Sequence, residues 1–181
     1  NSTWPPPQQL APSLAPAVLN GHISGWLTQP GEQDLLELVG MDGALPNVRI
    51  SGSDAIAAVN VNRSANKIDS FLERTIEYRP TVNESTGEAT AVLTFSMTNT
   101  APTSGYNDYV IGNQVDLPVG TNRTILDVYT RLGVDSASLD GDAVPPYTFP
   151  ELGYNVHSTT IEIPPGETVV MEFELSGQLE A

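Results

Sequence analysis

The chain has 181 residues, a length typical of one domain or of one domain with an added element. It carries 22 acidic and 7 basic side chains, so its formal net charge is -15. Such a surface repels the phosphates of nucleic acids and of anionic lipids, which excludes nucleic-acid binding and direct membrane contact as expected roles. The sequence contains no cysteine, and this excludes disulfides, thiol catalysis and zinc–thiolate sites.

The first 73 residues predict two segments of different character. Residues 1–21 are interrupted by prolines and predict a linker or the end of a fragment. Residues 22–73 predict a small α/β element, with strand candidates at 22–28 and 56–61 and helical apolar spacing at 30–39 and 66–73. Because about fifty residues bury little apolar surface on their own, we expect this element to pack against the rest of the chain.

Residues 74–181 change to a period of two, which indicates half-buried strands. Turn signals separate these strands, among them Asp140-Gly141 for a hairpin and Pro165-Gly166 for a type II turn. About seven short strands with such turns are typical of an antiparallel β-sandwich of the immunoglobulin-like type. The fold class is therefore predicted as mainly β with some α. The alternation places six side chains in the core: Leu93, Phe95, Met97, Val169, Met171 and Phe173.

The sequence favours no catalytic residue. Its two histidines, His22 and His157, are the natural candidates for a general base. Adjacent residues of a strand point to opposite faces, so Ser158 does not form a nucleophile–base pair with His157, and Ser24 near His22 is not part of a recognised nucleophile motif. No Gly-x-Ser-x-Gly nucleophile turn is present either. The chain is therefore predicted not to be an enzyme.

Calcium is the metal that best suits an acidic chain of this kind, because it binds clustered oxygens. The candidate ligands are Asp135, Asp140 and Asp142, which lie within eight residues of one another. However, the spacing of an EF-hand loop is missing, and turn geometry already explains Asp140-Gly141-Asp142. The sequence accordingly favours no metal and no cofactor.

Aromatic residues gather in two predicted loops and raise the possibility of sugar stacking. Tyr106, Asn107, Asp108 and Tyr109 form the candidate ligand site in the first loop. The second group, in residues 146–154, comprises Tyr147, Phe149 and Tyr154. Counting strand directions places the two groups at opposite ends of the sandwich, which favours tyrosines that anchor their loops over one shared binding platform.

Lys67 is the single lysine of the chain and allows one covalent alternative. A lysine can be crosslinked to asparagine beside a buried carboxylate, and Asn99 or Asn155 with Glu77 would supply these groups. Because Asp69 is close to Lys67 in sequence, an ordinary surface ion pair is the favoured interpretation.

Four segments, in this order, carry a resemblance to a known family: GEQDLLELVGMDGALP (31–46), NKIDSFLERTIEY (66–78), TFSMTNTAP (94–102) and LPVGTNRTILDVYT (117–130). Together they resemble the carboxy-terminal region of actinobacterial surface proteins of domain-of-unknown-function family 4012. The resemblance implies an extracellular fragment of a protein anchored in the membrane through an upstream segment, often encoded beside polysaccharide-assembly genes. It brings no catalytic residues with it.

These observations lead to an expected function and an alternative. The expected function is a non-enzymatic interaction or scaffold module of a bacterial cell-envelope protein, linked to the assembly of surface polysaccharide. Its partner would be an envelope protein or a polysaccharide. The alternative is an accessory domain of a cell-wall or glycan-processing enzyme whose active site lies outside this fragment.

Overall fold

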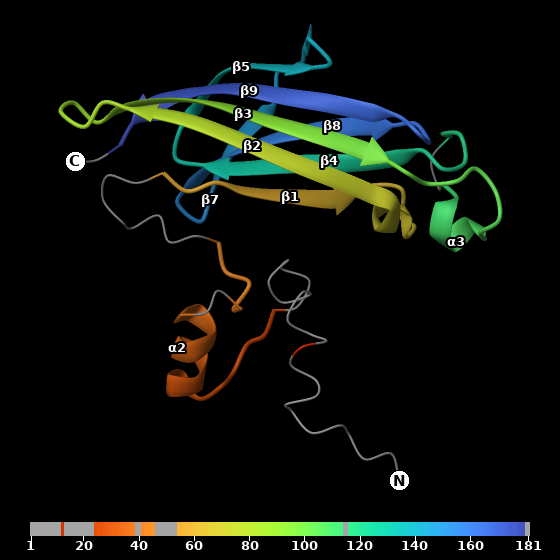
Figure 1. The fold of residues 1–181 in the computed structure, drawn as a ribbon, viewed down its shortest axis with the longest axis horizontal. Coiled ribbons are helices and arrows are strands. Elements are labelled where there is room, and N and C mark those ends of the chain that lie inside the picture. The colour runs from red at the N-terminus through yellow and green to blue at the C-terminus, as the bar shows by residue number, and fades with distance from the viewer. Residues whose placement is uncertain (1–11, 13–23, 39–40, 46–53, 114–115, 180–181) are drawn as a thin grey trace. The chain divides into compact units, whose positions relative to one another are not determined.

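The computed structural model describes residue 12 and residues 24–38, 41–45, 54–113 and 116–179. The chain divides into two compact units, residues 1–45 and residues 46–181. Each unit is described separately below, and the second one forms the body of strands in Figure 1.

The described part of the first unit consists of one helix and the segments that flank it. Helix α2 spans Pro30–Leu38, and proline suits the first turn because its missing N–H has no partner there in any case. The side chain of Gln33 accepts a hydrogen bond from the backbone of Leu27 at 2.9 Å. This confirms the helix predicted from Pro30. In contrast, residues 24–28, which fall in a predicted strand, do not form one.

The second unit is a β-sandwich of two antiparallel sheets (Figure 1). The first sheet has the strand order β1-β4-β8-β7, and the second has the order β2-β3-β9-β5-β6. The strands of the first sheet are β1 (Ala57–Asn62), β4 (Asn122–Thr130), β8 (Tyr154–Ile163) and β7 (Tyr147–Glu151). Those of the second are β2 (Leu72–Val82), β3 (Glu88–Asn99), β9 (Thr168–Gln178), β5 (Gly133–Leu139) and β6 (Asp142–Ala143).

The hydrophobic core lies between the two sheets and contains the predicted residues. The six core residues named from the alternation are all buried: Leu93, Phe95, Met97, Val169, Met171 and Phe173. The first sheet covers them with Leu126, Val128, Ile161 and Ile163, all fully enclosed. In strand β3 buried and half-buried residues alternate without interruption from Ala91 to Asn99, as a strand with one face on the core requires. The register predicted for β3 and β9 is therefore confirmed.

The boundary between the units differs from the one expected at residue 74. Strand β1 pairs with β4 from Ala57↔Tyr129 to Asn62↔Thr124, so the segment that precedes residue 74 supplies an edge strand of the sandwich. The two helical turns expected at 66–73 are reduced to a short 3₁₀ helix, η1 (Ile68–Phe71). Helical propensity is overridden here because Leu72 already pairs with Asn99 at the start of β2.

A second long connection, residues 100–121, runs between β3 and β4. It contains the one-turn helix α3, Asp108–Ile111, at the same end of the sandwich as η1 (Figure 1). Ile111 is buried, and its carbonyl accepts a hydrogen bond from Gly120 at 2.9 Å, which ties the end of α3 to the chain just before β4. The connection is thus fixed to the sandwich and can present side chains in defined positions.

The segment at residues 146–154, expected to be a loop, forms a hairpin. Strands β7 and β8 pair up to Glu151↔Tyr154, so only Leu152 and Gly153 remain in the turn. Both residues have positive φ, 51° and 85°, as a type I′ turn requires. The sequence did not reveal this turn because leucine is unusual in a left-handed conformation.

We expect Leu152→Asn to stabilise the protein. Asparagine tolerates positive φ better than leucine, and the Leu152 side chain is 75% exposed, so its removal loses little burial. The expected gain in the free energy of unfolding is about 1 kcal/mol, measured by urea denaturation. Leu152→Ala is the matched control, because alanine has a Cβ but lacks the polar group with which asparagine forms local hydrogen bonds in this conformation. An equal gain in both variants would contradict the assignment of backbone strain to Leu152.

Candidate functional site

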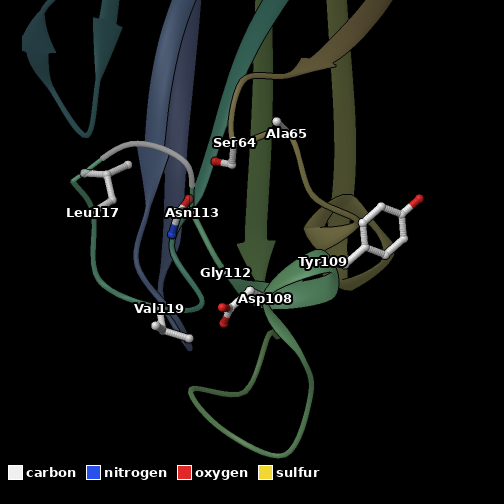
Figure 2. A pocket seen from close by; sticks show the side chains of 8 residues that line it. All are labelled: Ser64, Ala65, Asp108, Tyr109, Gly112, Asn113, Leu117 and Val119. Carbon is white, nitrogen blue, oxygen red and sulfur yellow. The ribbon is translucent and has the colours of Figure 1, made fainter.

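A pocket of about 480 Å³ lies where the β1–η1 connection meets helix α3 and the segment that follows it (Figure 2). This volume falls in the range of about 300 to 1,000 Å³ that is usual for small-molecule sites. Eight described residues line the pocket: Ser64, Ala65, Asp108, Tyr109, Gly112, Asn113, Leu117 and Val119. It is the best candidate for a functional site in the described part of the sandwich.

Two polar groups at this pocket are buried without a hydrogen-bond partner in the protein. They are the hydroxyl oxygen of Ser64, a residue that is 1% exposed, and the amide oxygen of Asn113. Figure 2 shows both side chains directed into the space between the two chain segments. A buried polar atom without a partner is costly, so it is uncommon outside sites that meet a ligand or water.

A network of asparagines holds the walls of the pocket in place. The side chain of Asn66 donates a hydrogen bond to the carbonyl of Gly112 and accepts one from the backbone of Ile68 at 3.2 Å. The amide of Asn62 donates to the side-chain oxygen of Asn66 at 3.0 Å, and its own oxygen accepts from the backbone of Ser64 at 2.7 Å. The segment carrying Ser64 is therefore tied to the segment carrying Gly112 before any ligand arrives.

Backbone geometry at the pocket is also constrained. Ala65 has a φ of 52°, a left-handed conformation that is unfavourable for a residue with a Cβ atom. A Cβ added to Gly112 would lie 2.6 Å from the Cα of Asp108, so only glycine allows the chain to leave α3 this close to the first residue of the helix. Backbone strain and close approaches of this kind concentrate at functional sites.

The structure divides the ligand candidates predicted from the sequence. Asp108 and Tyr109 line the pocket, although the ring of Tyr109 points away from the other labelled side chains in Figure 2. Tyr106 instead packs edge-on against Phe71, with 5.5 Å between the ring centroids. The side chain of Asn107, at the start of α3, makes no capping hydrogen bond. A stacking platform of both tyrosines is thus not formed.

The three aspartates predicted as calcium candidates do not gather into one site. Asp135 accepts a hydrogen bond from the hydroxyl of Ser176 at 2.8 Å near the start of β5. Asp140 lies beyond the opposite end of β5 and accepts from the backbone of Val170 at 2.8 Å. Asp140 and Gly141 form the predicted hairpin turn, with φ values of 53° and 87°, and Asp142 follows it. In the described residues no three acidic, histidine or cysteine side chains are grouped to hold a metal ion.

His157 is enclosed in the first sheet, whereas His22 lies outside the described residues. The Nε2 atom of His157 is 3.2 Å from the carbonyl of Leu132, and its Nδ1 atom is 2.9 Å from the hydroxyl of Thr148. A neutral ring with the proton on Nε2 donates to the first group and accepts from the second. Burial lowers the pKa of His157, although its hydrogen bond to Leu132 acts in the opposite direction. Both ring nitrogens thus hydrogen-bond to groups other than serine, and the ring joins β8 to β7 and to the β4–β5 connection.

We expect His157 to make the protein less stable below neutral pH. Its folded-state pKa lies below the unfolded value of about 6.5, so the unfolded chain binds the proton more readily. This contribution to stability is complete above about pH 6.5 and is lost as the pH falls toward the folded-state pKa. Urea denaturation between about pH 7.5 and 5.5 should show a decline in the free energy of unfolding of wild type that His157→Gln lacks. Equal pH dependence in the two proteins would contradict this role.

The groups required for a lysine crosslink are engaged in other contacts. The ammonium group of Lys67 lies 5.6 Å from the centre of the Tyr109 ring, on an exposed residue. Asn99 is fully buried and donates hydrogen bonds to the carbonyls of Gly120 and Ile163. Asn155 donates to the carbonyls of Arg131 and Leu132, and Glu77 is paired with Arg79 at 3.4 Å. The groups considered for a crosslink thus each have other contacts, and the structure lends the crosslink no support.

Comparisons with known proteins give no family. No protein-family model and no curated protein sequence matches the chain. A crystal structure from Legionella pneumophila, of a "putative nutrient binding protein", is similar with a TM-score of 0.38 and 10% sequence identity over 71% of this chain. The chain spans 45% of the length of that protein, and a similarity this distant carries no argument about function. In the described residues no helix is long and apolar enough to cross a membrane.

Proposed function

We propose that the chain is a non-enzymatic, extracellular interaction module of a bacterial cell-envelope protein, and that the pocket beside α3 is its binding site. The observation that carries the proposal is the pair of unpaired, buried oxygens of Ser64 and Asn113 at a preformed pocket. These groups form hydrogen bonds but do not titrate near neutral pH, so they suit binding better than proton transfer.

The remaining chemistry of the second unit also favours binding over catalysis. The enclosed ring of His157 is engaged on both nitrogens and has no access to a substrate. Asp108 is the one carboxylate among the described residues that line the pocket, whereas acid–base catalysis of glycosidic cleavage uses a pair. The cell-envelope location and the link to surface polysaccharide rest on the sequence resemblance, and they belong to the proposal.

An array of bacterial surface polysaccharides and purified envelope proteins tests this function with the immobilised chain. We expect retention of a defined partner by the wild type and reduced retention after Ser64→Ala, with no increase in reducing sugar ends during incubation. Ser138→Ala is the control, because Ser138 lies on β5 of the second sheet and does not line the pocket. We expect this variant to bind the same partners as wild type. Release of reducing ends, or the absence of any partner, would overturn the proposal.

A further inference from the structure

We infer that the pocket beside α3 takes a neutral, hydroxyl-bearing ligand of about the size of one sugar ring. This inference rests on the proposed function and names the ligand class of the same site. The inference rests on two kinds of side chain that line the pocket. Ser64, Asp108 and Asn113 supply oxygen atoms for hydrogen bonds, and Leu117 and Val119 supply apolar surface.

The polar lining accepts more hydrogen bonds than it donates. The amide oxygen of Asn113 can only accept, and one of the two N–H groups of the same amide already donates to the carbonyl of Pro118 at 2.9 Å. The carboxylate of Asp108 also accepts, while the hydroxyl of Ser64 can do both. A ligand that matches this pattern must present several donors, and the hydroxyls of a sugar or another polyol do so without carrying a charge.

Anionic ligands do not fit the electrostatics of this pocket. Asp108 contributes a negative charge, and none of the eight described lining residues is basic. The formal net charge of the whole chain, -15, adds a repulsive potential at long range. Phosphates, carboxylates and acidic sugars are therefore disfavoured relative to neutral molecules of the same size.

Cationic ligands fit less well than neutral ones. Calcium requires six to eight oxygens close to the ion, and this pocket offers one carboxylate within about 480 Å³. An organic ammonium group is usually recognised by aromatic faces, but Lys67 already lies over the ring of Tyr109, 5.6 Å from its centre. The aromatic contribution to cation binding is thus satisfied within the chain.

The apolar lining completes the match to a sugar ring. Leu117 and Val119 stand across from Ser64 in Figure 2, and the side chain of Val119 is 45% exposed. A pyranose has faces of C–H groups as well as hydroxyls at its rim, so it can contact an apolar wall while its hydroxyls bond to the polar one. The segments that carry both walls are held by the Asn66–Gly112 hydrogen bond, which limits the entropy lost on binding.

Titration of the protein with neutral monosaccharides, monitored by saturation-transfer NMR, tests this inference. Glucose, galactose, mannose and N-acetylglucosamine are the probes, with glucuronic acid, lysine and calcium chloride as charged competitors. A ligand of about 12 non-hydrogen atoms is expected to bind with a Kd on the order of 1 mM. At least one neutral probe should bind wild type at this level, with each charged probe weaker by tenfold or more.

Two variants assign the binding to the pocket. Ser64→Ala should weaken the sugar by about tenfold while leaving the melting temperature unchanged or higher, because it removes a polar atom that has no partner in the protein. Asp108→Asn should also weaken the sugar and should reduce discrimination against glucuronic acid. Ser138→Ala, outside the pocket, should bind like wild type. A structural role of Ser64 alone would instead lower the melting temperature.

Failure of this inference can be told apart from failure of the proposed function. If no neutral monosaccharide binds, or if binding is equal in wild type and Ser64→Ala, the ligand class is wrong. If the chain still retains a partner from the polysaccharide and protein array in that case, its role as an interaction module is upheld, but the partner binds to another surface. Saturable binding of calcium or lysine at the pocket would also overturn the ligand class. Binding of free sugars and of polysaccharide, compared directly, distinguishes a soluble ligand from a unit within a chain.

Discussion

Phe95→Ala should destabilise the sandwich by about 3 to 5 kcal/mol, because the side chain fills the centre of a closed core. Phe95 is 1% exposed, and its ring meets Phe173 edge-to-face with 6.2 Å between centroids. Both residues belong to the second sheet, and the fully enclosed Leu126 and Ile161 of the first sheet belong to the same core cluster. Removing the ring loses its burial and leaves a cavity that two rigid sheets close only in part.

Urea denaturation of the purified variant measures this loss. Val170→Ala is the matched control: it lies on β9 next to Met171, but it faces away from the core and is 39% exposed. The control should lose less than about 1 kcal/mol, since little apolar area returns to water. Similar losses in the two variants would contradict the register in which β3 and β9 direct alternate residues inward.

The strands were predictable where apolar and polar residues alternate along the sequence, because successive side chains then point to the core face and to the solvent face of the sheet. The residues from Ala91 to Asn99 and from Val169 to Leu175 keep this alternation because water covers one face and the core covers the other. The prediction failed for η1. The segment with helical apolar spacing is too short to form a stable helix by itself, so the pairing of β2 with β3 decides where the helix ends. It also missed β1 as an edge strand, since its partner β4 lies more than sixty residues further along the chain.

The candidate site was predictable only in part. Asp108 and Tyr109 could be named because they belong to a cluster of polar and aromatic residues in one predicted loop. Ser64 and Asn113 could not, because neither forms a motif and they meet only after β1 pairs with β4. A hint was available in the polar run around Ser64, between a strand and an apolar segment, which is typical of loops. Its significance depends on burial, which the sequence does not specify.

Asn99→Ala should destabilise the protein by about 3 kcal/mol or more, although it removes few atoms. The amide of Asn99 donates to the carbonyl of Gly120 at 2.7 Å and to that of Ile163 at 2.8 Å. Its side-chain oxygen accepts from the backbone of Ala101 at 3.0 Å. Since Asn99, Gly120, Ala101 and Ile163 are all buried, truncation removes the side-chain partner of two carbonyls and one N–H at a place out of contact with bulk water.

Asn99→Asp separates the hydrogen-bonding role from simple packing, because aspartate has nearly the same shape but cannot donate at neutral pH. Its second oxygen would face the carbonyls of Gly120 and Ile163, so burial and repulsion should raise its folded-state pKa above the unfolded value of about 3.9. A proton then favours the folded state, and the deficit relative to wild type should shrink as the pH falls from 7 toward 4. Asn107→Ala is the control, since that side chain makes no capping hydrogen bond, and it should change stability by less than about 0.5 kcal/mol. If Asn99→Asp is as stable as wild type at pH 7, shape and not the two donated hydrogen bonds makes this position sensitive, and a loss that does not vary with pH would contradict the raised pKa.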